Sequence, residues 1–330
     1  MDTDTPLHRT LLLAVAVVLT ALGIAGLVRG GRGGWGGYIY NPRHVVDWVE
    51  PRSAAAAAGL RAGDSVITVD GTPAEDLPMQ SRWANTRPGE SHRLVVMRGG
   101  LPVVADVVYR PRGANRFAQG ALVVLLAFLW CGLWARLSVP TVPARALASV
   151  GLAAGVGACS FGIPNIGGIW NGVISHVQMA ALVLMTVLLL RFFLVFPKPN
   201  RVSGSPVAAV ATYGVVALLV AFQVLELIVH PRLYLVTGNV GGLVMLAFFV
   251  LALVALTHTV VTTPRSEVWK SGLGWALIGV AAAIVAAVVP VVGTALRLEG
   301  LAWLELLFAA LPLALALAVR RQARWQGAGG

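Results

Sequence analysis

The sequence predicts an α-helical polytopic membrane protein of about eight transmembrane helices, with one small α+β domain of polar character outside the membrane. Two observations predict this fold class. Hydrophobic residues make up 57% of the 330-residue chain and charged residues only 12%, whereas a soluble domain is about one quarter charged. Apolar runs of about 18 residues or more, which are long enough to cross a bilayer as a helix, also recur along the chain.

The first apolar run covers residues 11–28 and follows a short segment, residues 1–10, which we place in the cytoplasm. A signal peptide would have a shorter apolar core and an A-x-A-like cleavage site, and neither is present here. The run therefore predicts an uncleaved transmembrane anchor. It is followed by a polar segment, residues 29–115.

The rest of the chain, residues 116–320, predicts a domain of seven transmembrane helices, and residues 321–330 predict a cytoplasmic tail. Short connections rich in Pro, Gly and Asn separate the seven apolar runs, as expected between adjacent helices. The predicted runs are 117–137, 146–163, 173–196, 207–229, 239–262, 272–295 and 300–319.

The distribution of basic residues predicts the orientation of these helices. With the N-terminus in the cytoplasm, the short outer loops carry only Arg232 and Arg297, and the inner connections and tail carry many more basic residues. Because Lys and Arg are in excess in cytoplasmic loops, both termini are expected inside and the polar segment outside, in a bacterial cytoplasmic (inner) membrane. The inner basic residues are Arg136, Arg145, Lys198, Arg201, Arg265, Lys270, Arg320, Arg321 and Arg324.

The net charge of +11 does not indicate a nucleic-acid partner. Most basic residues lie at the ends of apolar runs, where membrane topology and anionic lipid head groups account for them. Aromatic residues are not interleaved with them in the way a nucleic-acid platform needs. The lipid bilayer is therefore the expected partner of these charges.

The polar segment has the order of elements of a small recognition domain. A strand at residues 45–49 precedes a short helical turn, Ser53–Leu60, and a second strand runs into the tight turn Asp70-Gly71. A longer helix is expected at residues 75–85, and Arg98-Gly99-Gly100 predicts a hairpin between two alternating strands. This order, together with Gly63-Asp64, resembles a bacterial PDZ domain, a class that captures extended peptides by strand addition.

The resemblance also implies a peptide-binding loop. PDZ domains present backbone N–H groups of a glycine-containing loop to a terminal carboxylate, and the matching residues here are Gly36, Gly37, Tyr38 and Ile39. Glycine lets the backbone approach an anion closely. The edge at residues 38–41 and the helix at residues 75–85 should then form the groove. The alternative is that the glycines from Gly30 to Gly37 form a flexible linker.

Catalytic and metal motifs are not found. No histidine is followed by Glu, so the H-E-x-x-H pair of a zinc protease is missing. The stretch from Gly157 to Ser160 does not match a serine nucleophile motif, and the predicted spans contain no Asp. The sequence therefore predicts no enzyme activity, no catalytic residue, no metal ligand and no cofactor.

Polar side chains gather in the predicted outer halves of the spans. Ionisable residues are costly there and are functional candidates by default. They predict either an outward-facing pocket for a small or lipidated ligand or a set of interfacial groups that satisfy one another. The cluster comprises His176, Gln178, Gln223, Glu226 and Glu305.

Two membrane motifs extend the resemblance. The run from Leu190 to Pro197 ends the fourth span, and the run from Leu311 to Arg320 ends the last. With an outer PDZ-like domain between the first two spans, they resemble the membrane input module of competence-type sensor histidine kinases. This resemblance implies sensing of an extracellular signal. No phospho-acceptor or ATP-binding region follows in this sequence, so a separate output partner is expected.

The sequence thus predicts a non-catalytic sensor or recruiter. It would bind a peptide or protein terminus outside and couple that state to a membrane or cytoplasmic partner, such as a separate histidine kinase. The alternative is an accessory to envelope proteolysis that presents substrate to a separate protease. A transporter or a degenerate intramembrane enzyme is a further alternative.

Overall fold

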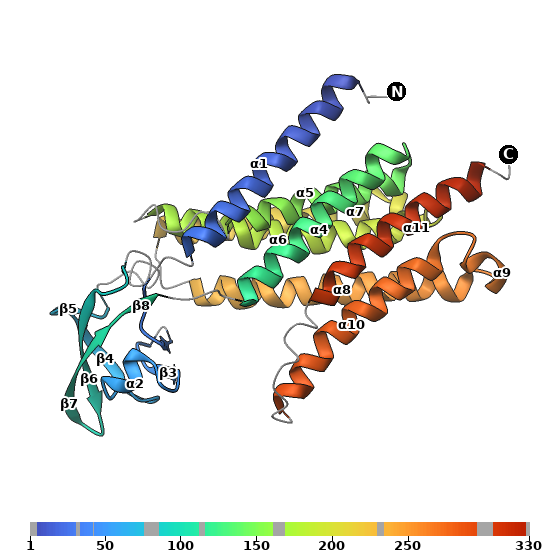
Figure 1. Ribbon diagram of the computed structural model, residues 1–330. Coiled ribbons are helices and arrows are strands. Elements are labelled where there is room, and N and C mark those ends of the chain that lie inside the picture. Colours follow the sequence, from blue (N-terminus) through green and yellow to red (C-terminus); the bar gives the residue numbers. More distant parts are fainter. Residues whose placement is uncertain are drawn as a thin grey trace.

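The computed structural model describes residues 5–30, 34–41, 43–75, 86–111, 116–160, 169–229, 234–295 and 306–327. Long helices form a bundle, and a small β-rich domain lies at one end of it (Figure 1). The N- and C-terminal ends of the chain lie on the side of the bundle away from this domain. The β-rich domain therefore projects from one end of the apolar bundle.

Eight long helices account for most of the bundle in the described part of the chain. Two short helices, η1 (Arg201–Gly204) and α9 (Arg265–Val268), connect long ones. The long helices are α1 (Pro6–Gly30), α4 (Arg116–Ser138), α5 (Val142–Ser160), α6 (Ile169–Val195), α7 (Pro206–Val229), α8 (Tyr234–Thr262), α10 (Leu273–Ala295) and α11 (Ala310–Gly327). Each of the eight predicted spans overlaps one of them.

The number of membrane-spanning helices differs from the prediction. Within the described residues, six helices are long and apolar enough to cross a bilayer, rather than eight. Within the described residues, α7 and α10 contribute shorter apolar segments, Thr212–Leu225 and Leu273–Ala286. Eight spans are therefore not confirmed. Helix α11 continues through residues 321–327 of the predicted cytoplasmic tail, whose location stays a prediction.

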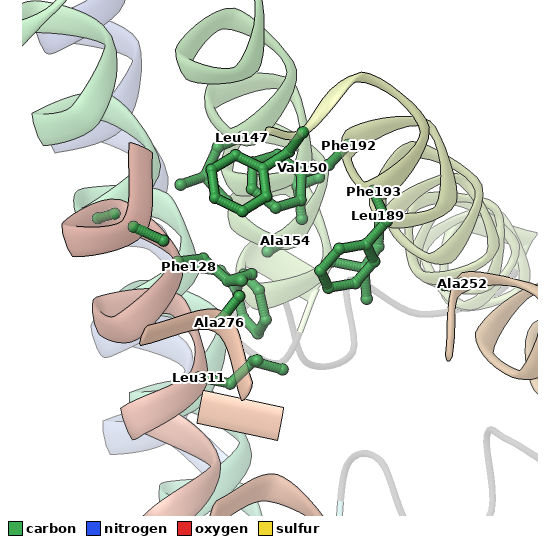
Figure 2. Packing of buried hydrophobic residues seen from close by; sticks show 14 of the residues in the cluster. Phe128, Leu147, Val150, Ala154, Leu189, Phe192, Phe193, Ala252, Ala276 and Leu311 are labelled. Carbon is green, nitrogen blue, oxygen red and sulfur yellow. The ribbon is translucent and has the colours of Figure 1, made fainter. Parts of the chain in front are cut away.

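The bundle core is built from large apolar side chains on several helices. Phe128, Leu147 and Phe192 belong to one core cluster with residues of α8, α10 and α11, and Figure 2 shows Phe128 near Ala276 and Leu311. Glycine allows α4 and α5 to approach closely. A Cβ on Gly132 of α4 would lie 2.7 Å from the Leu147 carbonyl oxygen, and a Cβ on Gly151 of α5 would lie 2.5 Å from that of Phe128. Gly132 and Gly151 therefore allow α4 and α5 to pack closely within the bundle.

The β-rich domain is built around an antiparallel four-stranded sheet of order β5-β4-β6-β7. Its strands are β4 (Ser65–Val69), β5 (Thr72–Pro73), β6 (Ser91–Arg98) and β7 (Leu101–Val108). The turn residues Asp70, Gly71, Gly99 and Gly100 all have positive φ, as tight two-residue hairpin turns require. Both predicted turns and the predicted hairpin are therefore confirmed.

A second layer covers this sheet. The hairpin of β2 (Tyr38–Tyr40) and β3 (Val46–Val49) leads into the one-turn helix α2 (Ala54–Ala57). Alternating residues of the strands face inward, which gives one compact apolar core. The core comprises Tyr38, Tyr40, Val46, Ala54, Ala55, Leu60, Val66, Ala74, Leu94, Val96, Ala105, Val107 and Tyr109. The helix expected at residues 75–85 lies outside the described residues beyond residue 75.

A short ladder joins the two ends of this domain. Strand β1 (Gly34–Trp35) pairs antiparallel with β8 (Arg110–Pro111), so that Gly34 faces Pro111 and Trp35 faces Arg110. Helix α1 ends shortly before β1, and helix α4 begins shortly after β8. The chain therefore enters and leaves the domain through one paired stem.

Candidate peptide-binding site

The glycine loop before β2 is held from one side by hydrogen bonds to its carbonyl groups. The Gly36 carbonyl accepts from the Ala55 backbone N–H at 2.8 Å, and the Gly37 carbonyl accepts from the Glu50 N–H at 2.7 Å. The Ser53 hydroxyl also donates to the Gly37 carbonyl, at 3.3 Å. The loop is therefore an ordered part of the domain, against the alternative of a flexible linker for these two residues.

This arrangement fixes where the N–H groups of the loop are directed. In a trans peptide unit the C=O and the following N–H lie in one plane and are directed oppositely. Since the Gly36 and Gly37 carbonyls face α2 and the end of β3, the Gly37 and Tyr38 N–H groups are directed away from them. Successive backbone N–H groups of this kind can form an anion-binding concavity where they converge.

Glycine is required at position 37 by both conformation and space. Its φ is +82°, in the left-handed region. A Cβ there would lie 2.1 Å from the Ser53 Cβ. Ser53 is itself fixed, because its hydroxyl caps α2 by accepting from the Ala56 N–H at 3.2 Å. The loop and the start of α2 therefore pack as one unit.

Strand β2 continues directly from this loop. In the described part of the chain, β2 pairs with β3 alone, along one edge. Tyr38 and Tyr40 are buried, whereas the Ile39 side chain between them is half exposed. An extended peptide could add to the other edge through backbone hydrogen bonds. The opposite wall predicted for the groove, the helix at residues 75–85, lies outside the described residues.

Two side-chain hydrogen bonds stabilise the region around the loop. Neither could be predicted from the sequence. The Trp35 indole N–H donates to the Glu50 carboxylate at 2.8 Å, which links the stem to the end of β3. The Tyr38 and Tyr109 hydroxyls are hydrogen-bonded at 2.9 Å in the core, where burial raises the pKa of Tyr109 to about 12. The Tyr109 phenol therefore remains neutral at physiological pH.

The Gly63-Asp64 motif has a clear structural role. Asp64 is buried and accepts two hydrogen bonds of 2.7 Å from the Arg98 guanidinium. It also accepts one of 2.8 Å from the Arg61 backbone N–H. The Arg98 hydrogen bonds hold the pKa of Asp64 below its ordinary 3.8, although burial alone would raise it. Asp64 thus links the loop after α2 to the end of β6 through these hydrogen bonds.

Acid should therefore weaken the domain through Asp64. Because the folded-state pKa is lowered, the stabilisation is fully present above the unfolded value of 3.8 and is lost as the pH falls through the folded value. We expect the free energy of unfolding to fall between about pH 5 and pH 2, and to fall less steeply in Asp64→Asn. Urea-dependent cleavage of the full-length protein by pepsin measures this. Parallel pH profiles for the two proteins would contradict the assignment.

The predicted polar cluster of the bundle is only partly described. His176 and Gln178 lie near the start of α6 and are half-buried, and Gln223 near the end of α7 is buried. Helices α6 and α7 pack together, so these residues belong to neighbouring elements. The side chains of Glu226 and Glu305 lie outside the described residues. The outward-facing pocket stays a prediction.

Comparison with known proteins identifies the β-rich domain. Residues 45–98 match the family model described as a PDZ domain. A stretch of 76 residues is 34% identical to the Regulator of sigma-E protease RseP of Escherichia coli (strain K12). That stretch is 23% of this chain and 17% of RseP, so the match spans less than a fifth of the length of that protein.

The RseP match contradicts the prediction that this chain is not an enzyme, because the relative is named as a protease. That prediction rested on missing short motifs, and similarity to part of a protease removes the ground for excluding catalysis. The aligned stretch covers the PDZ region only, so it assigns no reaction to this chain. Among the described residues no three His, Cys, Asp or Glu side chains are grouped as metal ligands.

The same matches bear on the family resemblance. They support a PDZ domain and a membrane protein, and they do not extend to the input module of histidine kinases. The two membrane motifs on which that resemblance rested lie in helices that neither match covers. This chain is therefore similar to PDZ-containing membrane proteins: a PDZ domain and, among its described residues, six helices able to cross a membrane.

Proposed function

We propose that this protein captures an extended polypeptide through its PDZ domain and takes part in regulated proteolysis at the membrane. The observation that carries the proposal is the ordered Gly36–Gly37 loop beside the edge of β2. The similarity of this region to part of RseP favours proteolysis over the other functions that the sequence left open.

The loop favours a terminal carboxylate as the group that is recognised. The Gly37 and Tyr38 N–H groups are directed away from α2, as derived above, and lie at the start of β2. A chain terminus bound there would place its preceding residues along the β2 edge, where backbone hydrogen bonds add affinity. The expected partner is a protein or peptide with a free C-terminus.

We place this domain outside a bacterial cytoplasmic membrane, with both termini in the cytoplasm. The support is the charge distribution along the bundle. Arg136 lies in the last turn of α4, Lys198 follows the end of α6, and Arg320 lies in the C-terminal half of α11, whose end lies away from the PDZ domain (Figure 1). Basic residues accumulate on the cytoplasmic side of membrane proteins.

Substitution at the β2 edge tests the capture of polypeptides. Ile39→Asp should weaken the binding of peptides by about tenfold, because a fixed negative charge would face the incoming strand and its carboxylate. Binding is measured with the full-length protein in nanodiscs and a displayed library of peptides with free C-termini. The matched control is Ile67→Asp on β4, because Ile67 is 43% exposed and Ile39 is 50% exposed. Equal binding by the two variants would overturn the proposal for this edge.

A second candidate function is sensing, which the stem of the domain favours. Trp35 lies in β1 and is hydrogen-bonded to Glu50 at the end of β3, so the peptide-binding hairpin is linked to the strands that lead to α1 and α4. Crosslinking in intact membranes separates the two functions. A protease among the crosslinked partners supports proteolysis, and a histidine kinase in its place supports sensing.

A further inference from the structure

A small basic hollow lies between α10 and α11. It has a volume of about 230 Å³ and is lined by Trp275, Leu317, Arg320, Arg321 and Arg324. Its residues come from the start of α10 and from the middle and C-terminal part of α11, and these segments lie away from the PDZ domain (Figure 1). The hollow therefore has no part in the capture of peptides proposed above.

The sequence of α11 brings these side chains to one face. Leu317, Arg320, Arg321 and Arg324 are spaced as i, i+3, i+4 and i+7, which is one stripe of an α-helix. Trp275 of α10 faces this stripe across the hollow. The apolar side chains of Trp275 and Leu317 thus lie beside three arginines that fall within about one turn of helix.

The other side of α11 is held in place by the end of α6. The buried Gln322 amide donates to the Pro197 carbonyl at 2.5 Å, and Lys198 lies 5.0 Å from the centre of the Trp325 ring. On the arginine face, Arg320 lies 4.4 Å from the centre of the Trp134 ring. The three arginines are therefore presented by a fixed helix and not by a flexible tail.

Among the described residues, no salt bridge joins a carboxylate to the arginines of the hollow. In the described part of the chain, no carboxylate oxygen lies within 4.0 Å of the Arg321 or Arg324 guanidinium nitrogens. The neighbouring acid, Glu267, is paired with Lys198 at 3.6 Å. Like charges three and four residues apart destabilise a helix, and a bound anion would offset that repulsion. Guanidinium groups bind phosphate by paired hydrogen bonds.

We propose that this hollow binds the head group of an anionic phospholipid. The phosphate contacts Arg321 and Arg324. The apolar lining favours a lipid over a free phosphate as the ligand. Trp275 and Ile278 lie three residues apart on α10 and are both exposed, so an acyl chain can lie along this face. Tryptophan is enriched where membrane helices meet the interface. Basic hollows between helices are suited to anionic head groups.

Lipid retention tests this site. Full-length protein is reconstituted in nanodiscs of phosphatidylglycerol and phosphatidylcholine, extracted, and analysed for bound lipid by native mass spectrometry. Wild type should retain one phosphatidylglycerol. The double variant R321Q/R324Q should bind phosphatidylglycerol about 30-fold more weakly, because each of the two arginines contributes a similar share of the binding free energy near an anionic surface.

The matched control is R145Q/R201Q, which removes two exposed arginines outside the hollow while keeping the same net charge as the test variant. It should retain phosphatidylglycerol as wild type does. Equal loss in both double variants would show general surface attraction and overturn the site. Displacement of the lipid by millimolar inorganic phosphate would show a phosphate site in place of a lipid site and would also overturn the proposal.

Discussion

Gly37→Ala is expected to destabilise the PDZ domain by about 3 kcal/mol. The left-handed backbone at φ +82° costs about 1–2 kcal/mol for an L-residue, and overpacking against a fixed neighbour costs about 1–3 kcal/mol more. That neighbour is Ser53, whose Cβ would lie 2.1 Å from the new methyl group. Urea-dependent proteolysis of the PDZ segment in the full-length protein measures the change, because cleavage follows the population of the open state.

Gly59→Ala separates the two causes of this effect. Gly59 has a φ of +81°, close to that of Gly37, and a Cβ there would meet no atom within 4 Å. We expect a cost of about 1 kcal/mol, from the backbone conformation alone. Gly59→Ala should leave the binding of peptides unchanged in the folded protein, whereas Gly37→Ala should abolish it. Equal costs for the two variants would contradict the packing of the loop against α2.

Asp64→Ala is expected to cost about 3 kcal/mol of PDZ stability. The substitution removes the acceptor of three hydrogen bonds, two of them from the Arg98 guanidinium, and bonds to charged groups contribute about 1.5–3 kcal/mol. The Asp64 side chain is only 2% exposed, so water cannot readily replace the lost carboxylate. The same proteolysis assay at neutral pH measures the loss.

Asp106→Ala is the matched control for the Asp64 substitution. Asp106 also pairs with an arginine of β6, Arg93, at 2.8 Å, but its side chain is 53% exposed. Exposed ion pairs contribute about 0–1 kcal/mol, so the expected change is below about 1 kcal/mol. If the two alanine variants lost similar stability, burial would not be the reason for the importance of Asp64.

The turns and strands of the PDZ domain could be predicted from the sequence because their signals are local. Asp70-Gly71 and Gly99-Gly100 carry the residues that positive φ requires, and the strands beside them alternate with period two. The binding loop was predicted from its glycines. Its packing against Ser53 was not, because this contact joins residues whose approach depends on the fold of the whole domain.

Long-range pairings could not be predicted for the same reason. Strands β1 and β8 are two residues each, too short for a periodic signal, and they pair only because the domain brings its ends together. The Tyr38–Tyr109 hydrogen bond also joins residues that are far apart in sequence. Hydropathy located each long helix in the described part of the chain, but only six of these helices are long and apolar enough within the described residues to span a membrane.

The paired stem of β1 and β8 sets how far the PDZ domain can reach from the membrane helices. Three residues separate α1 from β1 and four separate β8 from α4. Fully extended, they span at most about 14 Å and about 18 Å. Under the proposed function, the binding edge would stay close to the bundle, where a polypeptide held in the same membrane has a high local concentration. A weak affinity would then be enough to select such neighbours over distant soluble chains.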